Sequence, residues 1–127
     1  INETIKSKID KYKDFNEFQS VDVETLKQDL KEIMWSNAGI YRNRKLLSDA
    51  LDKLNDLENK FLRNDLGESI SEYEFKNMLT VAKIIVNCAI QREESRGAHY
   101  RLDFPDCNEE GLHSVVVNKT GELNFVK

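Results

Sequence analysis

The most apolar stretch of the chain, residues 72–95, limits the possible folds more than any other feature. Its aliphatic and aromatic residues recur every three or four positions: Phe75, Met78, Leu79, Ala82, Ile85, Val86, Ala89 and Ile90. Side chains at this spacing share one side of an α-helix, whereas a half-buried strand would alternate. A helix this apolar must be buried on much of its circumference. The stretch therefore predicts a long helix packed against other helices.

Two further stretches, residues 22–37 and 43–64, carry narrower stripes of the same period. The apolar positions are Val23, Leu26, Leu30, Ile33 and Met34 in the first, and Leu47, Ala50, Leu51, Leu54, Leu57 and Phe61 in the second. Short polar breaks separate the three stretches, and short connections favour antiparallel neighbours. We therefore predict an all-α fold over residues 22–106, an antiparallel three-helix bundle of the spectrin-repeat type.

Residues with capping chemistry mark the ends of these predicted helices. Asp22 can accept hydrogen bonds from the free N–H groups of the first helix. Gly39 can end that helix in the left-handed conformation. Ser71 with Glu74 has the spacing of a capping box at the start of the third helix. Gly97 can end the third helix as Gly39 ends the first, which would leave residues 98–105 extended.

The two ends of the chain differ from the predicted bundle. Residues 1–21 are polar and rich in lysine, and we expect a linker or a short helix there. Residues 107–127 contain a β-branched run at 115–117, turn-forming residues at 118–121 and a second apolar run. This pattern predicts an extended C-terminal arm or a small hairpin. Two strands alone are marginal in water, so the arm should pack on the bundle or on a partner.

Composition narrows the classes of function. The 127 residues carry a net charge of -4, so no global basic field would attract nucleic acid. No apolar run reaches the roughly 20 residues of a membrane span, and no signal-peptide pattern opens the chain, so we expect a cytoplasmic protein. The chain has two cysteines and two histidines, namely Cys88, Cys107, His99 and His113, and they lack the spacing of a zinc site. We expect Cys88 to be a small buried hydrophobe.

Charge is concentrated in the arginine-rich segment, residues 91–105, QREESRGAHYRLDFP. Its basic residues are Arg92, Arg96, His99 and Arg101. In one interpretation the arginines cap the negative end of the helix dipole and pair with acidic residues of the same segment, Glu93, Glu94 and Asp103. In the other, the cluster holds a neighbouring domain or an anion, because a planar guanidinium suits carboxylate recognition. The physical chemistry of the segment leaves both interpretations open.

The arginine-rich segment also resembles a motif of one protein family. REESRGAHYRLDFPD is similar, without a gap, to the ESRGAHxRxDFP segment in flavoprotein subunits of succinate dehydrogenases and fumarate reductases and in L-aspartate oxidases. Two upstream stretches resemble the same C-terminal domain, namely Met34-Trp35 followed by residues 38–42, and residues 77–82. The Met-Trp pair, the Gly-Ile turn and the short tail are most similar to L-aspartate oxidase.

This resemblance implies the C-terminal helical domain of a larger FAD-dependent enzyme. An L-aspartate oxidase converts L-aspartate to iminoaspartate, with fumarate or oxygen as electron acceptor, and opens NAD biosynthesis through quinolinate. The flavoprotein subunit of a succinate dehydrogenase or fumarate reductase, with a possible partner subunit, is the alternative. FAD would be bound by the preceding FAD-binding and capping domains, since the chain has no GxGxxG motif. The fragment would brace those domains, with no cofactor and no activity of its own.

No catalytic, cofactor-binding or metal-binding residue is carried over to this chain. The candidates are for contact with another domain or for anion binding: Arg92, Arg96, His99, Arg101, Tyr41 and Arg42. Trp35 and Tyr41 are expected to fill the bundle core or its edge, as large aromatics at helix ends usually do. An independent helical interaction module is the remaining alternative, and it predicts a uniformly polar surface. A domain taken from a larger enzyme should instead keep bare apolar and arginine-rich patches.

Overall fold

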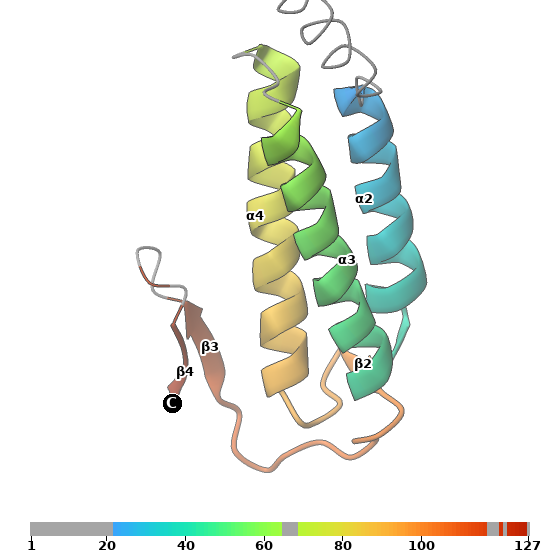
Figure 1. The fold of residues 1–127 in the computed structure, drawn as a ribbon. Coiled ribbons are helices and arrows are strands. Elements are labelled where there is room, and N and C mark those ends of the chain that lie inside the picture. The colour runs from blue at the N-terminus through green and yellow to red at the C-terminus, as the bar shows by residue number, and fades with distance from the viewer. Residues whose placement is uncertain (1–21, 65–68, 117–119, 121, 127) are drawn as a thin grey trace, which may run out of the picture.

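Three antiparallel helices form the body of the molecule. The computed structural model describes residues 22–64, 69–116, 120 and 122–126. Helix α2 spans Val23–Ala38, α3 spans Arg44–Arg63 and α4 spans Ile70–Gln91, and successive helices run in opposite directions (Figure 1). The predicted antiparallel three-helix bundle is confirmed. The prediction of a linker or short helix at residues 1–21 lies outside the described residues.

One apolar core lies between the three helices and uses all three predicted stripes. Its buried members are Leu26, Leu30, Ala38, Leu47, Ala50, Leu54, Leu57, Phe61, Phe75, Leu79, Ala82, Val86 and Ala89. The rings of Phe61 and Phe75 lie 5.1 Å apart between centroids and join α3 to α4. Removing such side chains from water is the main force that holds helices of this kind together. Hydrophobic periodicity is therefore sufficient to define the bundle.

The predicted capping box of α4 is wrong by two residues. Ser69 and Glu72 form the box, and α4 begins correspondingly earlier than expected. Ser71 and Glu74 instead hold Lys27 of α2, whose Nζ donates to Ser71 Oγ and to Glu74 Oε2 at 2.7 Å each. Lys27 is only 8% exposed, so its ammonium group requires these partners. The side chains that were predicted to cap α4 thus form hydrogen bonds between α2 and α4 instead.

Both predicted glycine stops are also corrected. Gly39 has φ -72° and ψ -137°, outside the left-handed region. A glycine fits there because a Cβ atom would lie 2.4 Å from the backbone oxygen of Trp35. Helix α4 ends at Gln91 rather than near residue 95, and the positive φ of 59° at Gly97 belongs to a later tight turn. Residues 98–105 form turns and one short strand instead of an extended stretch.

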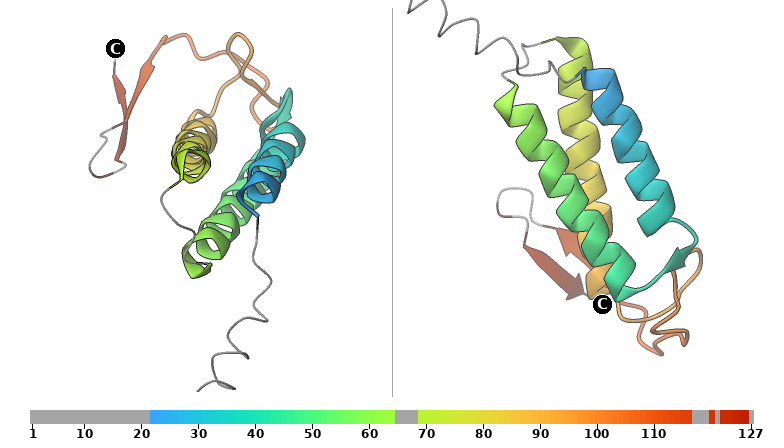
Figure 2. Two further views of the ribbon diagram at one scale, coloured as in Figure 1. Left: turned by 90° about the horizontal axis from the view of Figure 1, so that it is seen from above. Right: turned by 45° about the vertical axis from the view of Figure 1, so that its right-hand side comes forward.

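Four short strands make the all-α prediction only partly correct. Strand β1, Tyr41–Arg42, pairs in parallel with β2, Tyr100–Arg101. Strands β3, His113–Val116, and β4, Leu123–Val126, pair in an antiparallel manner, which confirms the predicted hairpin. The hairpin lies beside α4, on the side away from α2 (Figures 1 and 2). None of the described helices is both long and apolar enough to cross a membrane.

Candidate functional site

Two of the segments singled out in the sequence meet at one end of the bundle. Strand β1 follows α2, β2 belongs to the arginine-rich segment, and their parallel pairing sets Tyr41 beside Tyr100 and Arg42 beside Arg101. The N–H of Leu102 donates to the carbonyl oxygen of Arg42 at 2.7 Å. The rings of Tyr41 and Tyr100 meet edge to face, with centroids 6.3 Å apart. Two motifs far apart in the sequence therefore form one structural unit.

Arg101 is fully buried at the centre of this unit. Its Nη1 donates to the carbonyl oxygens of Ala89, Ile90 and Arg92 at 3.2, 2.8 and 3.3 Å. Carbonyls at a helix C-terminus lack partners within the helix, and a cation suits the negative end of the helix dipole. Its Nε and Nη2 donate to the two oxygens of Asp103 at 2.9 and 2.5 Å. Helix α4 therefore ends where the Arg101 side chain donates hydrogen bonds to its last carbonyl oxygens.

Asp103 connects Arg101 to the start of α3. Its Oδ2 also accepts a hydrogen bond from the N–H of Arg44 at 3.0 Å. Side-chain hydrogen bonds from Arg101 are the main reason that the pKa of Asp103 falls to about 2, against the opposing effect of burial. The guanidinium of Arg101 also lies 4.7 Å from the ring centre of Phe104. The end of α4, the start of α3 and β2 are thus held by one ion pair.

Glu94 is the second buried charge, with 6% of its surface exposed. It accepts hydrogen bonds from Arg92 Nη1 at 2.6 Å, from Arg96 Nε at 3.3 Å and from the N–H of Asn108 at 2.8 Å. Burial alone would raise the pKa of Glu94, but these hydrogen bonds outweigh burial and hold the pKa at about 2. Arg92 and Arg96 therefore pair within the arginine-rich segment, in line with the first interpretation of its charges. Glu93 pairs instead with α3.

Arg92 also fastens the C-terminal hairpin to the bundle. Its Nη2 donates to the carbonyl oxygen of Leu112 at 2.8 Å and to Ser114 Oγ at 3.0 Å. The guanidinium lies 5.4 Å from the ring centre of Phe125, a cation–π arrangement. One arginine at the end of α4 thus holds both strands of the hairpin, and the arm packs on the bundle as a marginal two-stranded sheet should.

His99 links the arginine-rich segment to β1. Two backbone hydrogen bonds with Arg96, of 2.8 and 3.0 Å, close a tight turn that contains Gly97. His99 Nδ1 lies 3.1 Å from Arg42 Nη1, and Nε2 lies 3.2 Å from the carbonyl oxygen of Arg92. An arginine can only donate and a carbonyl can only accept, so we assign a neutral imidazole with its proton on Nε2. Burial is the main cause that lowers the pKa of His99, in agreement with that neutral state.

The predicted contact residues fall into two groups according to whether they pair with a carboxylate among the described residues. Arg101 has no exposed surface, and Arg92 and Arg96 are both paired with Glu94. The other three, Tyr41, Arg42 and His99, are exposed or half-buried around β1. Contact with another domain stays a prediction, and its open candidates lie around β1 rather than among the three arginines of the segment.

Trp35 does not fill the core as expected. Its side chain is 77% exposed, and that of Tyr41 is 65% exposed. At about 100° per residue, Trp35 lies roughly 140° around α2 from the core residue Leu30, so it points away from the other helices.

Cys88 is half-buried rather than buried, and burial raises the pKa of its thiol.

Sequence patterns gave no signal for one residue at the centre of the site. Ser95 Oγ accepts from the N–H of Arg101 at 2.9 Å and donates to the carbonyl oxygen of Phe104 at 2.7 Å. It thereby fixes the loop around the buried guanidinium. A serine beside charged residues is common in exposed turns, so its position in the sequence does not indicate this role.

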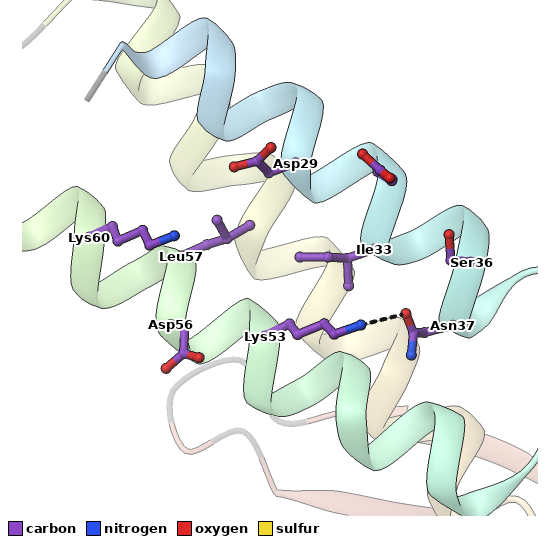
Figure 3. Close-up of a pocket in the computed structure, with 9 residues that line it drawn as sticks. Asp29, Ile33, Ser36, Asn37, Lys53, Asp56, Leu57 and Lys60 are labelled. Carbon is purple, nitrogen blue, oxygen red and sulfur yellow. Dashed lines mark hydrogen bonds between the residues drawn. The ribbon is translucent and has the colours of Figure 1, made fainter.

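A separate pocket of about 330 Å³ lies between α2 and α3 (Figure 3). Lys53 Nζ donates there to Asn37 Oδ1 at 3.3 Å, and Asp29, Asp56 and Lys60 line other parts of the pocket. Its charged lining residues are acidic on α2 and both acidic and basic on α3, and its lining includes neither histidine nor cysteine. No group of three or more potential metal ligands occurs within the described ranges. The pocket therefore offers no recognisable reaction chemistry.

Each helix N-terminus of the described bundle is capped by one of the chain's own side chains. Free N–H groups at a helix start can bind phosphate. In α2, α3 and α4 the side chains of Asp22, Asn43 and Ser69 accept hydrogen bonds from these groups. The fold and the arginine cluster together define a helical domain, in which charged groups fasten the turns and the arm to the bundle.

Comparison with known proteins identifies the family. The model of the fumarate reductase flavoprotein C-terminal domain matches residues 27–125, and this chain belongs to that family. It is 31% identical over 133 residues to a subunit of the CoM/CoB fumarate reductase of Methanothermobacter marburgensis, covering 99% of this chain and 24% of that protein. It is 37% identical over 105 residues to an L-aspartate oxidase of Acinetobacter baylyi, covering 77% and 18% respectively.

A solved structure shows the same fold. A quinol–fumarate reductase with menaquinol molecules superposes with a TM-score of 0.74 at 25% identity, covering 93% of this chain and 23% of that chain. The chain therefore spans about a quarter or less of the length of these relatives. The resemblance read from the motif segments is confirmed at the level of the family, which is one of flavoproteins.

Proposed function

We propose that this chain is the C-terminal helical domain of a FAD-dependent dicarboxylate oxidoreductase, and that it braces the FAD-binding and capping domains of the same polypeptide. The family match and the small share of each relative that the chain covers support this proposal. The bare surface supports it as well, since large apolar side chains such as Trp35, Ile40 and Val81 are more than half exposed. An independent module would keep a more uniformly polar surface.

The observation that carries the proposal is that β1 and β2 join two of the three segments that resemble the family. The ion pair of Arg101 and Asp103 fixes their geometry, and Arg101 has no surface left open to a reacting molecule. Residues held so firmly suit a rigid contact surface better than a catalytic centre. The redox chemistry would come from FAD held by the preceding domains, while this chain's residues keep the bundle and the β1–β2 surface in position.

For the substrate we propose L-aspartate, which would be oxidised to iminoaspartate at the start of NAD biosynthesis through quinolinate in the cytoplasm. Similarity to L-aspartate oxidases such as that of Acinetobacter baylyi supports this choice. The second candidate is the flavoprotein subunit of a fumarate reductase or succinate dehydrogenase, with a partner subunit. It is favoured by the match to the CoM/CoB fumarate reductase, which covers 99% of the chain.

Expression of the parent polypeptide, with its natural upstream sequence, tests both levels of the proposal. We expect the purified parent to show the visible absorbance of an oxidised flavin and the 127-residue chain to show none. L-aspartate should then reduce the bound flavin, while succinate should not. Reduction by succinate, or reoxidation by fumarate without any reaction with L-aspartate, would select the second candidate. Flavin binding by the 127-residue chain itself would contradict the bracing role.

A further inference from the structure

Helix α4 has a second apolar face that the described elements leave uncovered. Val81, Ile84 and Ile85 are 54%, 37% and 42% exposed, and half-buried Cys88 follows at the same helical spacing. Residues three and four positions apart share one side of a helix. A helix on the surface of a soluble domain normally presents polar side chains to water. The burial predicted for much of the circumference of α4 is therefore met only on the side that faces the core.

This face continues into a groove beside the β1–β2 pair. The groove has a volume of about 290 Å³, and its walls include Ile84, Ile85 and Cys88 together with Arg42, Arg92 and His99. None of the described side chains that line it is acidic. We call it the Arg42 groove. Its apolar wall and its basic rim together call for a partner that is partly apolar and carries negative charge.

Arg42 differs from the other arginines at this end of the bundle. Four of them pair with carboxylates, namely Arg44, Arg92, Arg96 and Arg101. Arg42 donates only to neutral acceptors, which are the carbonyl oxygens of Ala38 and Gly39 and the ring of His99. A half-buried guanidinium without a carboxylate is incompletely satisfied.

One nitrogen of Arg42 remains available for such a partner. Its Nη2 has no hydrogen-bond partner among the described residues. No fully buried side-chain nitrogen or oxygen in that part of the chain lacks a partner, so Nη2 keeps some solvent-accessible surface. A carboxylate that reached Nη2 would form a charge-assisted hydrogen bond, the strongest kind available to an arginine.

We propose that the Arg42 groove is the docking site for the flavin-binding portion of the parent polypeptide. A segment of that portion would place an aspartate or glutamate carboxylate on Arg42 Nη2 and an aliphatic or aromatic side chain against Ile84 and Ile85. This inference rests on the proposed function. The length of the relatives, of which this chain covers 24% or less, supplies the occupant within the same polypeptide. The charge of the groove selects the chemistry of the contact.

Thiol labelling of the full-length parent tests the apolar half of the contact. Ile84→Cys places a thiol in the groove, and Leu62→Cys, on the exposed side of α3 at 67% exposure, is the matched control. Labelling at each site is followed by mass spectrometry of its peptide and normalised to the rate in denaturant. We expect the thiol at position 84 to react about tenfold more slowly than that at position 62, because docking covers it.

Other outcomes of this labelling overturn the inference in distinguishable ways. Equal rates at both positions in a parent that contains flavin would overturn the docking site and leave the proposed function intact. Protection that disappears on dilution would assign the groove to a second copy, and protection that requires an added subunit would assign it to that subunit. A parent without flavin would overturn the inference and the proposed function together.

Cross-linking tests the charged half of the contact. Arg42→Lys replaces the guanidinium by an amine, which a carbodiimide can join to a neighbouring carboxylate. We expect mass spectrometry of the full-length parent to find an amide between position 42 and an aspartate or glutamate upstream of this chain. Exposed Lys45, present in both the parent and the variant, reports the background of unspecific cross-links. Cross-links from position 42 only to carboxylates within residues 1–127 would overturn the carboxylate assignment.

Discussion

The bundle core and the arginine-rich end of the same bundle are held together by different physics. In the core, apolar side chains from three helices exclude water. Substituting one of them by another apolar side chain of similar volume should cost only a moderate amount of stability. At the arginine-rich end, Arg101 and Glu94 are buried charges that each depend on several specific partners. A buried charge that loses its partner is strongly unfavourable. The first region is therefore redundant, whereas the second depends on a few residues.

This difference also decides where each region can respond to its surroundings. None of the described side chains in the core is titratable, so the contribution of the core to stability should change little with pH. The carboxyl groups of Glu94 and Asp103 have pKa values of about 2 because of their partners, so their contribution depends on pH. The arginine-rich end also carries the longest segment that resembles the family, whereas the core was predicted mainly from its apolar periodicity.

The largest expected effect lies in the core. Phe75→Ala should lower the free energy of unfolding by about 3–5 kcal/mol, because the ring is fully buried and its loss leaves a cavity against Phe61. Tyr73→Ala, on the exposed side of the same helix, is the control and should cost less than about 1 kcal/mol. Urea denaturation followed by circular dichroism measures both. Equal losses would mean that α4 is not anchored through its predicted apolar stripe.

Replacing Arg101 should give the next largest effect. It tests whether the arginine-rich end contributes as much to the free energy of unfolding as the core does. Arg101→Met should lower the free energy of unfolding by about 3 kcal/mol, near the lower end for a broken buried pair, since Asp103 keeps 30% of its side chain exposed to water. Arg44→Met, which breaks an exposed pair, should cost less than about 1 kcal/mol.

A double variant separates the ion pair from the helix cap in the same region. Adding Asp103→Asn to Arg101→Met removes the carboxylate charge that has lost its partner. The double variant should therefore recover part of the lost free energy of unfolding. The three carbonyls at the end of α4 would remain without their donor. Full restoration in urea denaturation would show that Arg101 serves Asp103 alone and does not cap α4.

The sequence was sufficient for the helices because each stripe repeats one kind of evidence many times. Leu47, Leu54 and Phe61 indicate the same helix face independently, so no single residue decides the prediction. The end of α4 could not be read in that way. The end of α4 depends on a contact with Arg101, which lies ten positions beyond Gln91 and folds back onto the helix. The spacing of residues near the end of α4 does not indicate this contact.

The candidate site was predictable as a segment but not as a geometry. The density of charge in residues 91–105 and its resemblance to the family motif both indicated the segment that carries the buried ion pairs. The pairing within the segment could be seen only from distances, because Glu94 accepts from Arg92 and Arg96 at once. The open position of Arg42 likewise depends on β1 meeting β2, a pairing that joins residues far apart in the chain.

Acid should weaken the arginine-rich end before it affects the core. The pKa of Glu94 is lowered from 4.5 to about 2 in the folded state, so the unfolded chain binds more protons between these values. Stability from this group is therefore full above the unfolded pKa and is lost as pH falls from about 5 towards 2. Urea denaturation from neutral to acid pH measures the slope, which Glu94→Gln should reduce. Asp52→Asn, an exposed change of equal charge on α3, is the control.

The smallest expected effect concerns the arm, which tests how far the influence of Arg92 extends. Phe125→Ala removes the cation–π contact with Arg92 and should change the free energy of global unfolding by about 0.5–1 kcal/mol at most. The hairpin should nevertheless open more often, so limited proteolysis within residues 107–116 should become faster. Val126→Ala, next in the strand and pointing to the opposite face, removes a similar exposed area without touching Arg92. If both variants were cleaved at the same rate, the hydrogen bonds from Arg92 to Leu112 and Ser114 would hold the arm without help from the ring.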